Sequence, residues 1–216
     1  MAKRSSTGAT KLMSLWAIVP VKPLRRGKSR LSEILSETER SRLNHQLFSH
    51  TIDVLKKVTA ISDILVVSRD SNVLTESREK NVRTVTENGT PELNNALRRA
   101  SVFSRAFSTE GVLIVPADLP MLTPDDVTAF IEQRTQPPVM VINPDRQRLG
   151  TNMLLIDPAD LITFSFGMDS FEKHCHLAKL AGAEVIVNEN DRIALDLDVP
   201  EDYEILCSKS VLPIMI

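Results

Sequence analysis

The sequence has little of several features that would assign it to a special class of protein. It contains two cysteines, Cys175 and Cys207, which are too few for a disulfide framework and favour a reducing cytoplasm. No apolar run approaches the roughly 20 residues that a membrane-spanning helix needs. The apolar stretch 15–21 is short and contains Pro20, so we expect no secretory signal. The aromatic residues lack the interleaved basic residues of a nucleic-acid platform.

Several catalytic and binding motifs are also missing. The glycine spacings of a P-loop and of a GxGxxG dinucleotide fingerprint do not occur. No Gly-x-Ser-x-Gly elbow occurs and neither cysteine has a base beside it in the sequence, so nucleophilic catalysis has little support. His174 and His176 would lie on different faces of a helix, and no second Cys/His cluster completes a zinc site. We therefore expect structural or surface roles for both histidines.

The charge is distributed unevenly although its sum is small. The 216 residues carry 26 Lys+Arg and 28 Asp+Glu, a net charge of −2. Eight of the basic residues and none of the acidic ones fall within residues 1–30, so the remainder carries a charge of about −10. This split suggests an anionic partner for the front of the chain. Residues 1–13, which are small, polar and basic, are instead expected to form a flexible, solvated terminus.

The composition and the apolar runs predict an α/β fold. With 42% hydrophobic and 25% charged residues the chain is globular, and its length suits a single domain over 14–216. Seven short runs are rich in Val and Ile and mostly continuous, as in strands that are covered on both faces. They are Trp16–Val21, Ile64–Ser68, Val82–Thr86, Val112–Pro116, Val139–Ile142, Asn152–Ile156 and Glu184–Val187.

Helices with recognisable starts lie between these runs. Ser36 and Glu39 form a capping box at the start of one helix. Pro91 and Pro124 are expected to open two others, over 92–107 and after the capping residue Thr123. Strands that alternate with helices predict a three-layer αβα arrangement around a mostly parallel sheet. The residues expected to face inward on the first two helices are Leu43, Leu47, Thr51, Leu55, Leu93, Leu97 and Ala100.

Residues 22–30, the basic loop, directly follow the first predicted strand. Ligands of open α/β sheets bind beyond the carboxyl ends of the strands, so this loop lies where a ligand is expected. Its five cations are costly to gather unless an anion lies among them, and a triphosphate fits. Gly27 would permit close backbone approach, while Lys28 and Arg30 would contact phosphate oxygens. The alternative is a solvated basic loop.

Carboxylates follow two other extended segments. Asp118 comes after the apolar run 112–115, where it can hold a divalent ion or a ribose hydroxyl. Its alternative role, capping the next helix, suits Thr123 better. Asp196 and Asp198 would point to the same side of an extended segment and repel each other unless a cation lies between them. Magnesium explains this pair, and the alternative is a solvent-facing edge strand.

Two weaker signals combine a glycine with a hydroxyl. Gly150 and Thr151 precede an apolar strand, and Gly167 shortly precedes Ser170 at the start of the helix that carries His174. A glycine followed by a hydroxyl at a helix start can bind a phosphate or a carboxylate, and it can equally be an ordinary helix cap.

These segments, taken in order, resemble the 2-phospho-L-lactate guanylyltransferase family, whose bacterial members are also called phosphoenolpyruvate guanylyltransferases. The resemblance covers about residues 15–206, and its motifs are VPVKPLRRGKSRLS, ELNNAL, VPADLPMLTPDDV, GTNMLL, FGMDSFEKH and LDLDVPEDY. It implies a Rossmann-like fold of the nucleotide-diphospho-sugar transferase type. Sugar-nucleotide and molybdenum-cofactor enzymes usually have a glycine-rich loop after the first strand, where this sequence has 20–24, PVKPL.

The resemblance implies an activity and a set of site residues. The family moves GMP from GTP onto the phosphate of a three-carbon phospho-acid and releases diphosphate, in the biosynthesis of coenzyme F-420. The acceptor is phosphoenolpyruvate or 2-phospho-L-lactate, with 3-phospho-D-glycerate as a further candidate. The implied Mg²⁺ ligands are Asp118, Asp196 and Asp198, and the implied phospho-acid contacts are Thr151, Gly167 and Ser170. The implied nucleotide contacts are Lys22, Lys28, Arg30, Glu92 and Asn94, and the implied catalytic residues are Lys28 and Asp118.

The same resemblance suggests which partners the protein has. A deazaflavin-modifying transferase would consume the product in the cytoplasm, and neither nucleic acid nor a membrane is expected as a partner. The apolar end 211–216 can pack on its own domain or on a partner, and of these a homodimer is favoured. Two other functions stay open: a related nucleotidyltransferase that uses a molybdenum-cofactor or sugar-phosphate acceptor, and a GTP-binding module without turnover.

Overall fold

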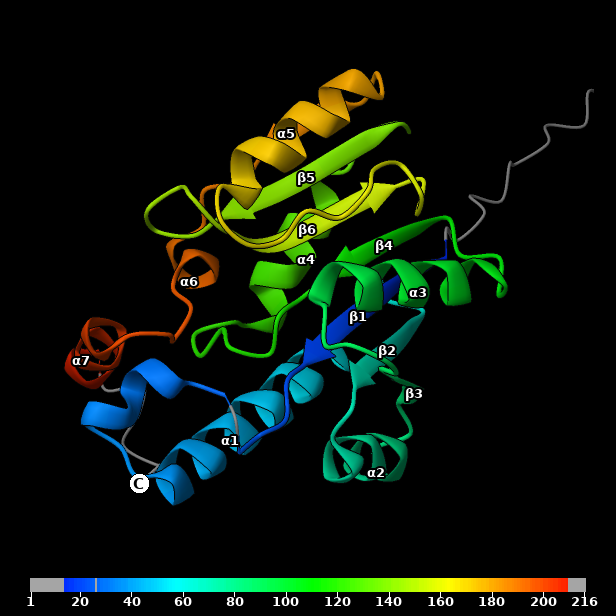
Figure 1. Cartoon of the computed structure of the whole chain (residues 1–216). Helices are drawn as coiled ribbons and strands as arrows, with labels where there is room; N and C mark the ends of the chain where they lie inside the picture. The colour runs from blue at the N-terminus through cyan, green and yellow to red at the C-terminus, as the bar shows by residue number, and fades with distance from the viewer. Residues whose placement is uncertain (1–13, 26, 210–216) are drawn as a thin grey trace, which may run out of the picture.

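The seven Val- and Ile-rich runs of the sequence form the seven strands of one sheet. The computed structural model describes residues 14–25 and 27–209, so the predicted flexible tail and the apolar end 211–216 lie outside the described residues. Within the described part the strand order is β3-β2-β1-β4-β6-β5-β7 (Figure 1). The strands are β1 Leu15–Val21, β2 Asp63–Ser68, β3 Arg83–Thr86, β4 Gly111–Ile114, β5 Val139–Pro144, β6 Thr151–Asp157 and β7 Glu184–Val187.

The sheet is parallel except for β6, as the prediction of a mostly parallel sheet requires. β1 pairs in parallel with both β2 and β4, whereas β6 runs antiparallel to β4 and β5. The short turn between β5 and β6 explains this reversal, because parallel neighbours need a crossover of a dozen or more residues. The first residues of β6 therefore lie at the same edge as the carboxyl ends of the other strands.

Helices cover both faces of the sheet and complete the predicted three layers (Figure 1). Alternate residues of β1 point to opposite faces: Ala17 and Val19 pack with α1, α2 and α4, and Trp16 and Ile18 pack with α3 and α5. None of the described helices is long and apolar enough to cross a membrane. The helices are α1 Glu37–Leu55, α2 Ser71–Glu79, α3 Leu93–Arg105, α4 Pro124–Glu132, α5 Ser170–Leu180, α6 Asp191–Ala194 and α7 Pro200–Ser208, with a 3-10 helix, η1, at Ser29–Glu33.

Two of the predicted helix starts are confirmed and one is wrong. Ser36 caps α1 in a capping box, and Thr123 caps α4 with Pro124 in its first turn. Pro91, however, does not open α3. The carboxylate of Glu92 accepts hydrogen bonds from the backbone N–H groups of the next residues, so Glu92 takes the N-cap position and Leu93 begins the helix. Leu93 is consequently 37% exposed, not inward as predicted.

A separate leucine cluster joins the basic loop to the acidic segment 195–198. Leu31 of η1 and Leu197 of the acidic segment are both completely buried in it. Its buried members are Leu31, Leu35, Leu43, Leu47, Leu195, Leu197 and Leu206. Burying each of these side chains stabilises the fold by roughly 1.5–3 kcal/mol. The cluster therefore holds the basic loop and the acidic segment close together at the edge of the sheet. In the sequence the two are far apart, since Leu31 and Asp196 are separated by 165 positions.

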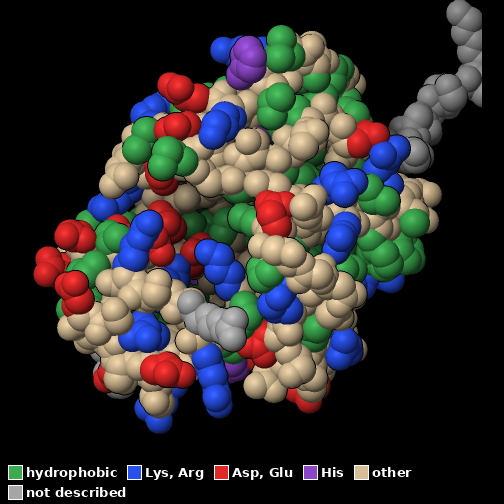
Figure 2. Space-filling model, in the orientation of Figure 1, with side chains coloured by type: hydrophobic (Ala, Val, Ile, Leu, Met, Phe, Trp, Pro, Cys, Tyr) green, Lys and Arg blue, Asp and Glu red, His purple; other side chains and the backbone are tan. Residues whose placement is uncertain are grey.

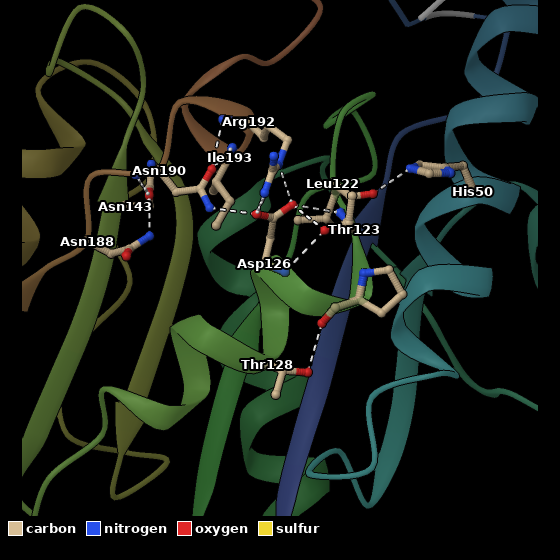
Figure 3. Close-up of polar contacts among 11 residues, drawn as sticks. His50, Leu122, Thr123, Asp126, Thr128, Asn143, Asn188, Asn190, Arg192 and Ile193 are labelled. Atoms are coloured by element: carbon tan, nitrogen blue, oxygen red, sulfur yellow. Dashed lines mark hydrogen bonds and ion pairs between the residues drawn. The ribbon is translucent and has the colours of Figure 1, made fainter.

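A polar network around Asp126 fixes the chain just before the acidic segment. Asp126 of α4 is 3% exposed and accepts three hydrogen bonds from the guanidinium of Arg192, at 2.6–3.1 Å (Figure 3). Asn190 donates to the same carboxylate at 2.7 Å, and the backbone N–H of Asn190 donates to Asn143 of β5 at 3.1 Å. These bonds attach α6 to both α4 and the sheet.

The network keeps the Asp126 carboxylate ionised. Although burial alone would raise the pKa of Asp126, hydrogen bonds from Arg192, Thr123 and Asn190 lower it to about 2. The lowered value means that the ionised form stabilises the fold. This contribution is complete above the pKa of an unfolded aspartate, roughly 4, and is lost as the pH falls towards 2.

We predict that Asp126→Asn destabilises the protein by about 2 kcal/mol at neutral pH, because it removes the charge from several short hydrogen bonds. The half-exposed Arg192 can return to water, which limits the loss. Urea unfolding measures the difference, which should shrink as the pH falls from 4 to 2. Asp125→Asn, at the exposed neighbouring position, is the matched control and should change stability little. Equal effects of the two substitutions would contradict this role of Asp126.

Candidate active site

Four segments from distant parts of the sequence meet at the carboxyl edge of the sheet. They are the basic loop after β1, the loop 115–123 after β4, the start of β6 and the acidic segment 195–198. β1 lies between β2 and β4, so the strand order reverses at β1. Open α/β sheets bind their ligands at such a reversal, beyond the carboxyl ends of the strands. In Figure 2 basic and acidic side chains gather around a hollow on this side of the molecule.

The beginning of the basic loop is held by two polar side chains. The backbone N–H of Leu24 donates to Asp70 at 3.0 Å, and the Asn44 amide donates to the Leu24 carbonyl at 2.7 Å. A Cβ at Gly27 would come within 2.7 Å of the Asn44 amide nitrogen. A side chain at position 27 would therefore force Asn44 to move, and the predicted approach of Gly27 to phosphate stays a prediction. Lys22 is exposed where the loop leaves β1.

Lys28 points inward to Asp118. Its backbone has φ +58°, in the left-handed region that residues other than glycine rarely adopt, so its surroundings hold it in place. The side chain is 7% exposed, and its Nζ lies 2.8 Å from Oδ2 of Asp118. The two residues that the sequence proposed as a catalytic pair are therefore in direct contact.

Asp196 lies beside this ion pair and carries the most perturbed carboxylate of the site. Its pKa is raised to about 6, first by burial and second by the negative charge of Asp118. The Asn152 amide, which donates to Asp196 at 3.2 Å, and the charge of Lys28 act in the opposite direction. The backbone N–H of Leu197 donates to the Asp118 carbonyl at 3.0 Å, which joins the two acidic segments.

Asp198 has a different partner from the other two predicted metal ligands. Its carboxylate accepts from Arg30 at 2.7 Å, in a pair that is largely open to solvent. Within residues 14–25 and 27–209, no three Asp, Glu, His or Cys side chains lie close enough together to hold a metal ion. The structure brings Asp118 and Asp196 together with Lys28, and it leaves Asp198 paired with the basic loop.

The predicted phospho-acid contacts form a second group around the start of α5. Ser170 donates to Thr151 Oγ1 at 3.2 Å, and the buried His174 lies 3.0 Å from the same oxygen. Gly167 has φ +120°, a conformation that requires glycine, and a Cβ there would meet nothing within 4 Å. The backbone is therefore open to an approaching group at Gly167.

Glu92 and Asn94, predicted near the nucleoside, are engaged with the protein itself. Both carboxylate oxygens of Glu92 accept backbone hydrogen bonds at the start of α3. The Asn94 amide accepts from the Phe166 N–H at 2.7 Å and donates to the Phe166 carbonyl at 3.2 Å. In this state Asn94 anchors the loop that carries Gly167. A contact of either residue with the nucleoside stays a prediction.

The start of β6 divides the site into two halves. Successive strand residues point to opposite faces, so Thr151 faces α5 while Asn152 faces α6 and the acidic segment. Asn152 was missed by the sequence analysis, although its place directly after Thr151 in GTNMLL could have indicated it. His174 is buried and His176 is exposed, so the two histidines lie on different faces of α5 as predicted, but the contact of His174 with Thr151 was missed. The four-residue spacing from Ser170, one helical turn, was the available signal.

Neither cysteine lies in this site as a nucleophile. Burial raises the pKa of the Cys175 thiol, which disfavours the reactive thiolate, and Cys207 is exposed on α7. The sequence-based expectation that cysteine chemistry has little support agrees with this arrangement.

Comparison with known proteins relates this geometry to one family. Residues 15–209 match the family described as "Guanylyl transferase CofC like". A phosphoenolpyruvate guanylyltransferase of Rubrobacter xylanophilus is 38% identical over 190 residues, covering 88% of this chain and 92% of the relative. A 2-phospho-L-lactate guanylyltransferase of Methanobrevibacter smithii is 30% identical over 188 residues, covering 87% and 81%.

Solved structures share the fold at low sequence identity. A nucleotidyl transferase from Methanothermobacter thermautotrophicus has a TM-score of 0.65 at 14% identity, covering 91% of this chain and 97% of that one. A 4-diphosphocytidyl-2C-methyl-D-erythritol synthase from Anaerococcus prevotii has a TM-score of 0.60 at 13% identity, covering 92% and 99%. A structure from Desulfovibrio desulfuricans that is named as a nucleotide-diphospho-sugar transferase has a TM-score of 0.71 at 15% identity, covering 93% and 90%. The predicted nucleotide-diphospho-sugar transferase type of fold is confirmed.

We predict that Asp196→Asn stabilises the protein in the absence of metal. The pKa of about 6 against 3.8 for an ordinary aspartate means that the ionised carboxylate destabilises the fold above pH 6, by up to roughly 3 kcal/mol. Protonation removes this penalty gradually as the pH falls from 6 towards 3.8, where an unfolded aspartate also takes up its proton. An asparagine removes it at every pH and can still accept from Asn152. Thermal unfolding at pH 8 should therefore give a Tm several degrees higher.

Asp198→Asn is the matched control, because the carboxylate of Asp198 is exposed and paired with Arg30. It should give no comparable gain in Tm. A lower Tm for Asp196→Asn than for the natural protein would show that Asp196 is not held against an unfavourable environment.

Proposed function

The chain belongs to the CofC-like guanylyltransferase family, and from this premise we propose that it transfers GMP from GTP to the phosphate of a three-carbon phospho-acid. The relatives named above point to phosphoenolpyruvate or 2-phospho-L-lactate as the acceptor, and 3-phospho-D-glycerate is chemically similar. The observation that carries the proposal is the Lys28–Asp118–Asp196 cluster beside the Thr151–Ser170 hydroxyl pair. One half suits a nucleoside triphosphate and the other an anionic acceptor.

The reaction needs no general base. An oxygen of the acceptor phosphate, which is already ionised at neutral pH, forms a bond to the α-phosphorus of GTP. The bond from that phosphorus to the bridging oxygen of the β-phosphate breaks, and the electron pair leaves with diphosphate. This agrees with a site in which His174 is fully buried and its pKa is lowered by burial to about 4. Positioning and electrostatic stabilisation would supply the rate.

Lys28 and Arg30 are proposed to stabilise the departing diphosphate. Both belong to the basic loop, and both are paired with carboxylates, Asp118 and Asp198 respectively. A buried cation without a partner is costly, so before GTP binds these carboxylates stabilise the two cations. Bound phosphate oxygens would then compete with the carboxylates for Lys28 and Arg30. Lys22, at the exposed start of the loop, would add to the attraction of the triphosphate.

Magnesium is the metal that we propose for this site. Asp118 and Asp196 fit it, because two carboxylates so close that one raises the pKa of the other are stabilised by a cation. Asp198 is proposed to join them once Arg30 has bound phosphate. The ion would reduce the repulsion between the two reacting polyanions. The chain itself orients these carboxylates through Asn152 and through the Asp126 network that holds α6.

The product is proposed to serve coenzyme F-420 biosynthesis, as the family resemblance implies. A deazaflavin-modifying transferase would consume it, and the cytoplasm is the proposed location because the two cysteines are unpaired. A homodimer stays a prediction, since it rested on residues 211–216.

The proposal is tested by incubating the purified protein with GTP and Mg²⁺ and, in turn, phosphoenolpyruvate, 2-phospho-L-lactate and 3-phospho-D-glycerate, and measuring diphosphate. A trapping transferase and its deazaflavin substrate are included because some of the products are unstable. Diphosphate release that depends on one of these acceptors supports the proposal. A molybdopterin and a sugar phosphate are added in parallel reactions, and release with one of these alone would favour the related nucleotidyltransferase. GTP binding without any turnover would favour the binding module.

We predict that Asp118→Asn lowers kcat by at least about 100-fold while the protein stays folded, because the site loses both the partner of Lys28 and a metal ligand. Lys28→Ala should lower kcat/KM for GTP by about 100-fold. Lys11→Ala, in the tail outside the described residues, is the matched control and should have almost no effect. Near-normal turnover of Asp118→Asn, or equal effects of the two lysine substitutions, would refute these assignments.

A further inference from the structure

His174 is a fully buried histidine to which the proposed reaction gives no task. It is completely buried on α5, one turn after Ser170 and on the same side of the helix. The ring of Phe166 packs edge-on against it, with the ring centres 4.8 Å apart. Both ring nitrogens have partners: Nε2 lies 2.9 Å from the Ser165 backbone nitrogen, and Nδ1 lies 3.0 Å from Thr151 Oγ1.

These partners decide where the ring carries its proton. A backbone N–H can only donate, so Nε2 of His174 must be the unprotonated acceptor for Ser165. Burial lowers the pKa of the imidazole to about 4, so the ring is neutral at neutral pH and holds a single proton. That proton is therefore on Nδ1, and Nδ1–H donates to Thr151 Oγ1.

The donation constrains the two hydroxyl groups next to it. Thr151 Oγ1 accepts from His174 and also from Ser170, whose Oγ lies 3.2 Å away, so both of its lone pairs are used. The Thr151 hydroxyl must then direct its own hydrogen elsewhere. If the Thr151 and Ser170 hydroxyls exchanged roles, the hydrogen of Ser170 would be left over instead. In either arrangement the pair offers one O–H donor to an incoming group.

The loop between β6 and α5 is held at two adjacent residues, Ser165 and Phe166, by side chains of α5 and α3. Asn94 of α3 pairs with the N–H and the carbonyl of Phe166, and His174 accepts from Ser165. The next residue is Gly167, whose open backbone needs a positive φ. The Thr151–Ser170 pair and Gly167 are thus fixed relative to each other before any ligand binds.

We propose that His174 is a positioning residue whose fixed Nδ1–H form makes the Thr151–Ser170 pair a donor to an acceptor-only group, an ionised oxygen of the phospho-acid. This inference rests on the proposed function and deepens it. An ionised phosphate or carboxylate oxygen can only accept hydrogen bonds, so it needs a donor such as this O–H. A hydroxyl or an amide can also donate, so it could bind to a site that offered only acceptors. His174 thereby selects the ionised acid without contacting it.

Two substitutions separate the two ring nitrogens. His174→Gln places an amide oxygen near the position of Nε2, which keeps the acceptor for Ser165 but removes the donor to Thr151. His174→Asn places an amide near the position of Nδ1, which keeps the donor and loses the acceptor. We expect His174→Gln to raise the KM for the phospho-acid by about tenfold or more, the usual size for a hydrogen bond to a charged group, with an unchanged KM for GTP. His174→Asn should stay within a few-fold of the natural protein in both constants.

His176→Gln, at the exposed position on the same helix, is the control and should change nothing. A merely structural role of His174 predicts instead that both of its substitutions lower kcat and shift both KM values together, and that outcome would overturn the inference. Nitrogen-15 NMR of the full-length protein gives a readout without turnover. It should show His174 with a protonated Nδ1 and an unprotonated Nε2 at pH 7, and a protonated Nε2 would equally overturn the inference.

Calorimetric binding of phosphoenolpyruvate and of 2-phospho-L-lactate distinguishes this inference from the proposed function. Binding that His174→Gln weakens, in a protein that transfers no GMP, would refute the proposed function and leave the inference standing. If the protein transfers GMP and His174→Gln leaves the KM for the acid unchanged, the proposed function stands and the inference is refuted. Absence of binding of either acid to the natural protein would overturn both.

Discussion

The site depends on the contact between the Lys28 ammonium and the Asp118 carboxylate, with Asp196 next to both. Lys28 is almost buried and has a strained backbone, and Asp196 is an acid held where its ionised form is unfavourable. Such an arrangement persists only if its surroundings over-determine it. Leucine packing supplies part of that constraint, because the same cluster buries Leu31 beside the basic loop and Leu197 beside Asp196. The Asp126 network supplies the rest by attaching α6 to α4 and the sheet.

The site has two halves with different electrostatic character because one strand, β6, runs in the opposite direction to its neighbours. Because β6 runs antiparallel, its first residues rather than its last lie at the ligand edge of the sheet. Its side chains alternate there, so Thr151 serves the hydroxyl-rich half and Asn152 the carboxylate half. Adjacent residues of one strand thus link the half proposed for the acceptor phosphate to the half proposed for the triphosphate. The proposed chemistry needs that proximity more than it needs a base.

The fold could be predicted from the sequence because its signals are local. Val- and Ile-rich runs gave all seven strands, and the capping residues Ser36 and Thr123 gave two helix starts. Local signals were ambiguous where a side chain competed for the cap, as Glu92 did with Pro91. The site was only partly predictable, because it depends on pairings between residues that are 44 to 90 positions apart in the sequence. Lys28 and Asp118 were both named as site residues, but their ion pair was not predicted. The contacts of Asn94 with Phe166 and of Asn152 with Asp196 depend on register, which the sequence does not display.

The central claim is that this edge of the sheet transfers a nucleotidyl group to a phospho-acid. The most direct test uses GTP with a radioactive label in its α-phosphate. The labelled GTP is incubated with the protein, Mg²⁺, each phospho-acid and the trapping transferase, and the labelled products are identified. The account predicts that the label appears in the guanylylated acid, or in the GMP that leaves when the trapping transferase moves the phospho-acid onto the deazaflavin, and never in diphosphate. GTP labelled in the γ-phosphate should release all of its label as diphosphate. Release of the γ-label as single inorganic phosphate, without transfer of the α-label, would contradict the account.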